Sequence, residues 1–277
     1  MTISRLTEKD IPLLQAMLVR EPVQNLYLLG LLAEFGVEPA KGRPRFGFYG
    51  RFQGKTLAAA LFVGGNGGLV VPSASDPIAL AEIGSALAKR VKLLSALGDL
   101  PAVDAVVRQL LVGRPRYTRS QRLYAVSADD LGPFTNPTLR LATQTDLAQL
   151  LPMAAGAMKE MLGRHPLQED PAGFERRVLQ RIEGRRTYVL EVEGKLVFKL
   201  EVGSRSPHGA ELEGLYTLPD QRRCGHATLC LGQISRHLLS SLPRLTLRID
   251  DKQTALASIA RKVGYLGGKS QRLVIAG

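Results

Sequence analysis

The sequence predicts a mixed α/β protein made of two similar halves. Two observations support this: stretches of the first half recur in the same order in the second, and strand and helix patterns alternate through the second half. The first recurrence aligns residues 3–17 with 139–153, and it matches Thr7 with Thr143 and Asp10 with Asp146. Each copy reads as a short strand, then a threonine that caps a helix, with an aspartate three residues later.

Two further recurrences mark a hairpin and a strand. Residues 52–55 match 192–195, and in both copies a glycine lies between β-rich runs, as in a hairpin turn. The letters Ser-Gln-Arg-Leu occur at 120–123 and again at 270–273. Turn signals near Asn136 and Pro137 separate the copies, so we predict an N-terminal domain over 1–136 and a C-terminal domain over 137–277.

The elements of the second half follow from its periodicity. The helix expected at 225–240 carries Ala227, Leu231, Ile234 and Leu238 on one face, which is the stripe needed to pack on a sheet. The complete predicted order is strand 139–142, helices 146–162 and 171–182, strands 187–192, 196–202 and 210–217, helix 225–240, strand 244–249, helix 254–263 and strand 271–276.

Composition excludes several classes of protein. The 277 residues are 45% apolar, and the longest apolar run, Leu57 to Val63, is far shorter than the ~20 residues of a membrane helix. No signal-peptide core forms before Lys9 and Asp10, so we expect no membrane association and a cytoplasmic location. Cys224 and Cys230 are expected to be free thiols, and the scattered histidines predict no metal site.

The net charge of +12 favours an anionic partner. Nucleic acid, a phosphorylated metabolite and a nucleotide cofactor all fit that charge. Its even spread over both halves disfavours a nucleic-acid footprint. A basic cluster at Arg176, Arg177, Arg181, Arg185 and Arg186 is interpreted as a solvated helix face, with contact to an acidic acceptor or nucleic acid as the alternative.

The segment from Leu215 to Thr228 carries the chemistry. A strand enters a loop, and the loop opens a helix whose first turn holds Gly225 and Ala227, with no bulk at either position. The first N–H groups of a helix lack partners within the helix, and the positive end of the helix dipole lies there. This turn is therefore an anion-binding site, the anion seat, and the positive charges of Arg222 and Arg223 add to its attraction for an anion. It matches neither the P-loop nor the Gly-x-Gly-x-x-Gly fingerprint.

The pattern Arg222-x-x-Gly225-x-Ala227, followed by an amphipathic helix, a strand, a helix and Gly264-Tyr265, resembles the GNAT acetyltransferase superfamily. The resemblance implies tandem GNAT-like domains, each a central mixed, mostly antiparallel β-sheet flanked by helices. It also implies acetyl-CoA as co-substrate, with backbone amides of the loop around its pyrophosphate. The implied cofactor-binding residues are Leu215, Tyr216, Thr217, Arg222, Arg223, Cys224, Gly225, His226, Ala227 and Thr228.

The first half lacks this loop. Residues 71–78 stand in its place without the Arg-x-x-Gly pattern, and Asp76 would repel a phosphate. We therefore expect a degenerate N-terminal domain that binds no cofactor.

Acetyl transfer to an amine requires a base, because an amine of pKa ~10.4 is only about one part in a thousand neutral at pH 7. Glu211 and Glu213 lie two apart on a predicted strand and so share one face, and either could be that base, with Glu213 preferred. Solvated charges on a strand face are the alternative for both. The resemblance implies a general-acid tyrosine four residues before Gly264, but this chain has Ala260 there, which leaves Tyr216 or Tyr265 as the nearby phenols.

The sequence therefore predicts an acyl-CoA-dependent N-acyltransferase that moves acetyl to a primary amine by direct attack. The acceptor would be a small-molecule or peptide amine. Because the usual tyrosine is missing, a non-catalytic acyl-CoA-binding or regulatory protein of the same fold is the alternative.

Overall fold

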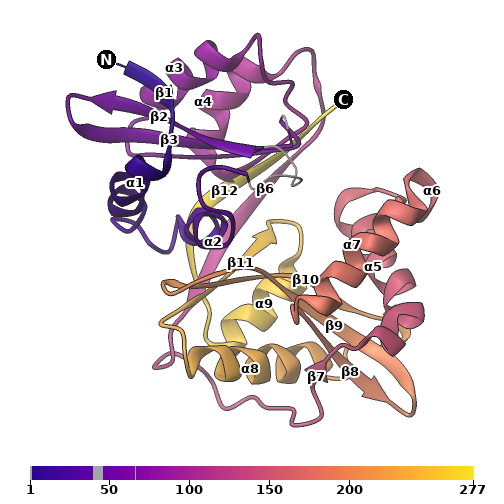
Figure 1. Ribbon diagram of the computed structural model, residues 1–277. Coiled ribbons are helices and arrows are strands. Elements are labelled where there is room, and N and C mark those ends of the chain that lie inside the picture. The colour runs from indigo at the N-terminus through magenta and orange to yellow at the C-terminus, as the bar shows by residue number, and fades with distance from the viewer. Residues whose placement is uncertain (1, 40–45, 66) are drawn as a thin grey trace.

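The described residues form one twelve-stranded sheet to which both halves contribute (Figure 1). The computed structural model describes residues 2–39, 46–65 and 67–277. Along the sheet the strand order is β1-β2-β3-β4-β5-β12-β6-β11-β10-β9-β8-β7. Both halves contribute strands to it, and helices cover both faces, so the mixed α/β class predicted from the sequence is confirmed.

The first half runs from a short strand to a long one. Its elements are β1 (Thr2–Arg5), a 3-10 turn (Glu8–Asp10), α1 (Ile11–Leu18), α2 (Leu26–Phe35), β2 (Phe46–Gln53), β3 (Thr56–Gly64), β4 (Leu69–Ala74), α3 (Pro77–Leu87), β5 (Ser95–Asp99), α4 (Leu100–Leu110) and β6 (Pro115–Val126).

The second half repeats this order with added short helices. Its elements are β7 (Arg140–Leu141), a 3-10 turn (Gln144–Asp146), α5 (Leu147–Leu162), α6 (Pro166–Glu169), α7 (Pro171–Glu183), β8 (Thr187–Val192), β9 (Lys195–Ser206), β10 (Gly209–Thr217), a 3-10 turn (Pro219–Gln221), α8 (His226–Leu239), β11 (Leu245–Asp250), α9 (Thr254–Val263) and β12 (Leu266–Ala276).

Most elements of the second half lie where the sequence places them, with three differences in length. The first strand, β7, is only two residues long. The strands β9 and β12 extend beyond the predicted 196–202 and 271–276. Pairing explains the extension, because β9 stays bonded to β10 as far as Ser206 and β12 pairs with β6 from Leu266 onward.

The helix starts of the two halves share one capping arrangement. Asp10 accepts hydrogen bonds from the backbone N–H (2.8 Å) and hydroxyl (2.9 Å) of Thr7. Asp146 does the same for Thr143 at 2.8 and 3.1 Å, with almost the same backbone angles at the threonine. Each carboxylate thereby satisfies an N–H group at its helix start. The duplication inferred from the sequence therefore extends to local geometry.

The last strand of each half is inserted into the sheet of the other. The C-terminal strand β12 lies between β5 and β6 of the first half, and β6 lies between β12 and β11 (Figure 1). The two Ser-Gln-Arg-Leu copies meet at this seam, where Gln271 is paired with Gln121 and Arg272 with Ser120. The pseudo-twofold axis that relates the two halves therefore passes close to the pair formed by Gln121 and Gln271.

Helix α2 joins the halves on one face of the sheet. It buries Leu28, Leu29 and Leu32 in the core of the first half and also packs on β9 and β10 of the second. The crossing is tight: a Cβ added to Gly30 would lie 2.5 Å from the Cβ of Ser204. On the opposite face, α8 and α9 pack over the strands of the second half. Among the described helices, none has both the length and the apolar character needed to cross a membrane.

Candidate functional site

A cleft opens where β10 and β11 diverge. The two strands pair in parallel only from Ala210 to Leu212, opposite Leu245 to Leu247. Beyond that point β10 bulges against β9, and Gly214 adopts a left-handed φ of +62° that other residues rarely take. A cavity of about 530 Å³ lies beside the last residues of β10, between the starts of α8 and α9. Its size is within the usual range for sites that hold small molecules.

The predicted anion loop forms one end of this cleft. Gly225 is the N-cap of α8 with φ +84°, and Arg223 is also left-handed at +66°. These angles turn the chain so that α8 begins at the cleft. His226, Ala227 and Thr228 occupy its first turn, where backbone N–H groups have no partner within the helix.

Nearly all the cofactor-binding residues predicted from the sequence line this cleft. Cys224 differs: its side chain is exposed, and its thiol lies 3.6 Å from the carbonyl oxygen of Arg222. The predicted residues on the lining are Leu215, Tyr216, Thr217, Arg222, Arg223, Gly225, His226, Ala227 and Thr228.

The remaining wall is mostly apolar and comes from α9. Ala255, Leu256 and Ile259 lie along it, with Gln253 at the start of the helix. The cleft thus combines an end rich in N–H groups and guanidinium groups with an apolar passage beside a strand. This donor set fits the diphosphate and the pantetheine arm of an acyl-CoA.

Arg222 is held by groups that the sequence did not indicate. Its guanidinium donates to both carboxylate oxygens of Glu160 in α5, at 2.8 and 2.9 Å, and to the carbonyl oxygen of Thr217 at 3.0 Å. It also lies 5.4 Å from the ring centre of Tyr216. Glu160 is more than fifty residues distant in the chain, so no local spacing could have connected the two.

Glu211 and Glu213 have different surroundings. Glu211 is buried and bound to the guanidinium of Arg248 on β11, and Thr246 donates to it at 3.3 Å. Burial raises the pKa of the Glu211 carboxyl, and Arg248 opposes that rise. Glu213 lies just past the last paired residues, where the strands separate, and its side chain is 34% exposed. Of the two, Glu213 is therefore the carboxylate that an acceptor can reach.

Glu213 is oriented by Arg181 from α7. The Arg181 Nη2 atom lies 2.6 Å from the Glu213 Oε1 atom, and its Nη1 atom lies 2.8 Å from Glu201. The interpretation of the basic cluster as a solvated face is therefore wrong for Arg181, and also for Arg186, which is half-buried and lies 2.6 Å from Glu34 of α2. Arg176 and Arg185 are exposed, as that reading expects.

Tyr27 is a contribution from the first half. It is carried by α2, and its ring lies 5.5 Å from the guanidinium of Arg248. Burial and the nearby Glu213 and Glu211 raise the pKa of its hydroxyl. Sequence reasoning missed Tyr27, because only the packing of α2 across the two halves brings it here.

The two candidate phenols have separate positions. Tyr216 lines the cleft but is mostly buried, with its hydroxyl 3.5 Å from Glu160, and burial together with Glu160 raises its pKa. Tyr265 is fully buried under α8, 2.7 Å from the Ser235 hydroxyl, and so does not reach the cleft. Ala260 also lies in the core, and Ile259 is its neighbour that faces the cleft.

The first half also has a cleft where two parallel strands diverge, but a carboxylate lies at the helix start beside it. Strands β4 and β5 pair only at Val70 and Ala96 and then diverge. At the start of α3, Asp76 accepts a hydrogen bond from the Ile78 N–H at 2.9 Å, so a carboxylate occupies the anion seat. The absence of a cofactor here stays a prediction.

In the described part of the chain, no group of three or more histidine, cysteine, aspartate or glutamate side chains could hold a metal ion. No family model and no curated protein matches the sequence.

Solved structures do resemble it. A protein from Drosophila has a TM-score of 0.68 at 16% identity, covering 99% of this chain and 98% of that one. A GNAT-family acetyltransferase from Colwellia psychrerythraea has a TM-score of 0.58 at 12% identity over both complete chains. A tandem GNAT protein from the clavulanic acid biosynthesis pathway has a TM-score of 0.57 at 12% identity, covering 100% and 98%. The chain therefore has the tandem GNAT fold, as the loop motif predicted.

Proposed function

We propose that this protein is an acyl-CoA-dependent N-acyltransferase that moves acetyl from acetyl-CoA to a primary amine. One observation carries the proposal: helix N–H groups without a partner in their helix lie at one end of a cleft whose other walls are largely apolar. Glu213 does not line this cleft, but it lies on β10 two residues before Leu215, which does, at the point where β10 and β11 separate. Acetyl-CoA would supply the activated thioester. Catalysis would belong to residues 137–277, and we also propose a cytoplasmic location.

In the proposed reaction the amine nitrogen attacks the thioester carbonyl and the C–S bond breaks. Glu213 accepts the proton that the ammonium group must lose, and Arg181 fixes the direction of its carboxylate. After the attack the nitrogen loses a second proton, which passes through water to the departing thiolate, whose thiol pKa is ~8.5. The N–H groups of Gly225 to Thr228 hold the diphosphate, and Ile259 and Leu256 exclude water along the passage.

The first experiment tests binding. Saturating CoA should raise the melting temperature of the full-length protein by about 5 °C, since ligand at 100 times its Kd adds about 2.7 kcal/mol. Gly225→Asp should abolish this rise because it puts bulk and negative charge at the seat.

Gly113→Asp is the matched control. Gly113 has a φ of +80° and open space around it, as Gly225 has, but it lies in the first half. Both variants should therefore have similar backbone strain, and only Gly225→Asp should lose the response to CoA. An unchanged melting temperature of the wild type with CoA would refute the cofactor assignment.

The second experiment tests turnover. A panel of primary amines is mixed with acetyl-CoA, and release of free CoA thiol is measured. The alternative function, a non-catalytic acyl-CoA-binding protein, is favoured by the apolar Ile259 and the buried Ala260 where a phenol is usual in the fold. It would be supported by CoA binding without thiol release for any amine.

A further inference from the structure

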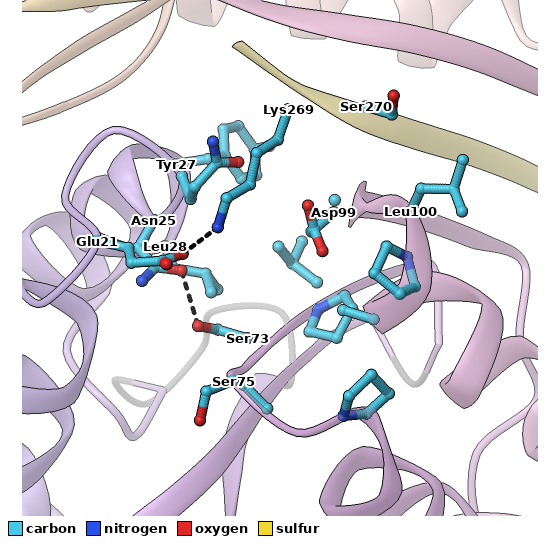
Figure 2. Close-up of a pocket in the computed structure, with 18 of the residues that line it drawn as sticks. Glu21, Asn25, Tyr27, Leu28, Ser73, Ser75, Asp99, Leu100, Lys269 and Ser270 are labelled. Atoms are coloured by element: carbon cyan, nitrogen blue, oxygen red, sulfur yellow. Dashed lines mark hydrogen bonds and ion pairs between the residues drawn. The ribbon is translucent and has the colours of Figure 1, made fainter.

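The cleft of the first half holds a second cavity, of about 590 Å³ (Figure 2). Its walls come from α2, from the ends of β4 and β5, from the start of α4 and from β12. Both halves therefore build it, although it lies in the opening between strands of the first half alone. Nothing in the proposed transfer reaction uses it.

Four charged side chains line this cavity, and three of them have partners. Glu21 and Lys269 form an ion pair of 2.7 Å at the mouth. Arg248 is bound to Glu211, which lies outside the cavity. Asp99 is the fourth, and within the described residues its carboxylate has no hydrogen bond and no ion pair. Among the described residues, Asp99 is therefore the charged group of this lining that has no bonded partner, although Lys269 lies close enough to act on it.

The lack of a hydrogen-bond partner is unusual for an aspartate at this position. Asp99 is the N-cap residue of α4, where an aspartate normally accepts a hydrogen bond from the first turn of its helix. Here it makes no such bond. Figure 2 shows its side chain on the wall opposite Asn25 and Ser73, directed into the space between them. Partial burial raises the pKa of the Asp99 carboxyl, and Lys269 offsets part of that rise.

The rest of the lining is neutral and combines polar side chains with apolar ones such as Leu28, Val71 and Leu100. Ser73 donates to the Asn25 amide oxygen at 2.7 Å, and Ser75 and Ser270 are also among the lining residues. Hydroxyl groups of this kind can donate or accept, so they suit a ligand that carries hydroxyl groups. The whole chain carries +12 and repels cations in general, so any cation bound here depends on local contacts.

We propose that this cavity binds a small hydroxylated compound with one primary ammonium group, which Asp99 holds as its counter-ion. The site is separate from the acyl-CoA cleft. It does not depend on the proposed transferase activity.

The test uses a matched pair of probes on the full-length protein. Glucamine and sorbitol are open-chain compounds of the same length that differ in one group, an ammonium in place of a hydroxyl. Isothermal titration should show glucamine binding at least about tenfold more tightly than sorbitol, because a hydrogen bond to a charged group outweighs a neutral one. Equal affinity, or no binding of glucamine to the wild type, would overturn the proposal.

Two variants should shift binding in opposite directions. Asp99→Asn should weaken glucamine binding about 10- to 100-fold. It should also raise the melting temperature of the free protein, because it removes an unpaired, partly desolvated carboxylate. Lys269→Gln should leave glucamine binding unchanged or make it tighter, since it removes a competing cation. Asp129→Asn, at an exposed position far along the chain, is the control and should change neither property.

The outcomes separate this site from the first one. Retention of glucamine binding by Asp99→Asn would contradict the assignment of the counter-ion. Competition of CoA with glucamine would show that the two ligands share one cleft and would also contradict it. Failure of CoA to bind at all would leave the glucamine result intact, because the cavities have no lining residue in common.

Discussion

Asp146 shows how one residue of a repeated motif acquired a further role. Its copy, Asp10, only caps a helix start, whereas Asp146 is buried and also binds both Nη atoms of Arg140, at 2.7 and 2.9 Å. Those bonds lower the pKa of Asp146 to about 2 from an ordinary value of 3.8. The charged carboxylate therefore stabilises the fold above pH 4, and this contribution is lost as the pH falls from about 4 to 2.

Asp146→Asn should lower the free energy of unfolding by about 2 kcal/mol at pH 7. The loss should shrink as the pH falls from about 4 to 2, because the carboxyl of the unfolded wild type takes up a proton near pH 4 and that of the folded protein only near pH 2. Asp10→Asn removes the same cap without an arginine partner, and about 1 kcal/mol is expected. Urea unfolding at several pH values measures both variants, and equal losses would contradict a role for Arg140.

The two strand carboxylates should separate activity from stability. Glu213→Gln should reduce turnover by about two to four orders of magnitude while CoA binding is kept. Glu211→Gln leaves Arg248, whose side chain is 6% exposed, without its counter-charge, so a stability loss of about 3 to 5 kcal/mol is expected. Thiol release and urea unfolding measure the two effects. Full activity of Glu213→Gln would remove it from the mechanism.

For individual residues, the sequence predicted which side chains line the cleft better than it predicted what each side chain does. The loop motif identified most of the cleft lining, because those residues are consecutive in the chain. The period-two rule also placed Glu211 and Glu213 on one face, where both act on Tyr27. Their different exposure depends on Arg248, Arg181 and α2, which come from distant segments. Only the packed structure supplies that information.

Among the elements, α2 has the most demanding position, because it packs on both halves. Gly30 permits this, since its missing side chain leaves room for Ser204 on β9. Sequence periodicity places a helix on a sheet, but it does not say which half supplies the sheet. The same limit applies to strand lengths, which the pairing of β9 and β12 decides.

Gly30→Ala should destabilise the protein by about 1 to 3 kcal/mol because the added methyl group overlaps Ser204. Ser204→Gly in the same chain should restore part of the loss. Ala33→Ser, on the exposed side of the same helix, is the control and should be nearly neutral. Thermal unfolding measures all three. A neutral Gly30→Ala would mean that the helix can move away from β9.

For the whole molecule, the exchange of β6 and β12 ties the two halves together. Cutting the chain at residue 136 separates β6 from β11 and β12 from β5, which leaves long unpaired edges in both pieces. We expect residues 1–136 and 137–277, made separately, to unfold without cooperativity. Mixed together, they should form a one-to-one complex, which native mass spectrometry detects. Cooperative unfolding of either piece alone would contradict this expectation.

The seam between β12 and β5 also bears on how the chain is made. Strand β5 ends at Asp99, but its partner β12 begins only at Leu266. Until β12 has been synthesised, the edge of β5 has no partner strand. The residues of β5 and β12 that then pair are more than 170 positions apart in the chain. The sheet of the first half is therefore completed only after both halves have been synthesised. We therefore expect chaperones that cover unpaired strand edges to raise the yield of native protein.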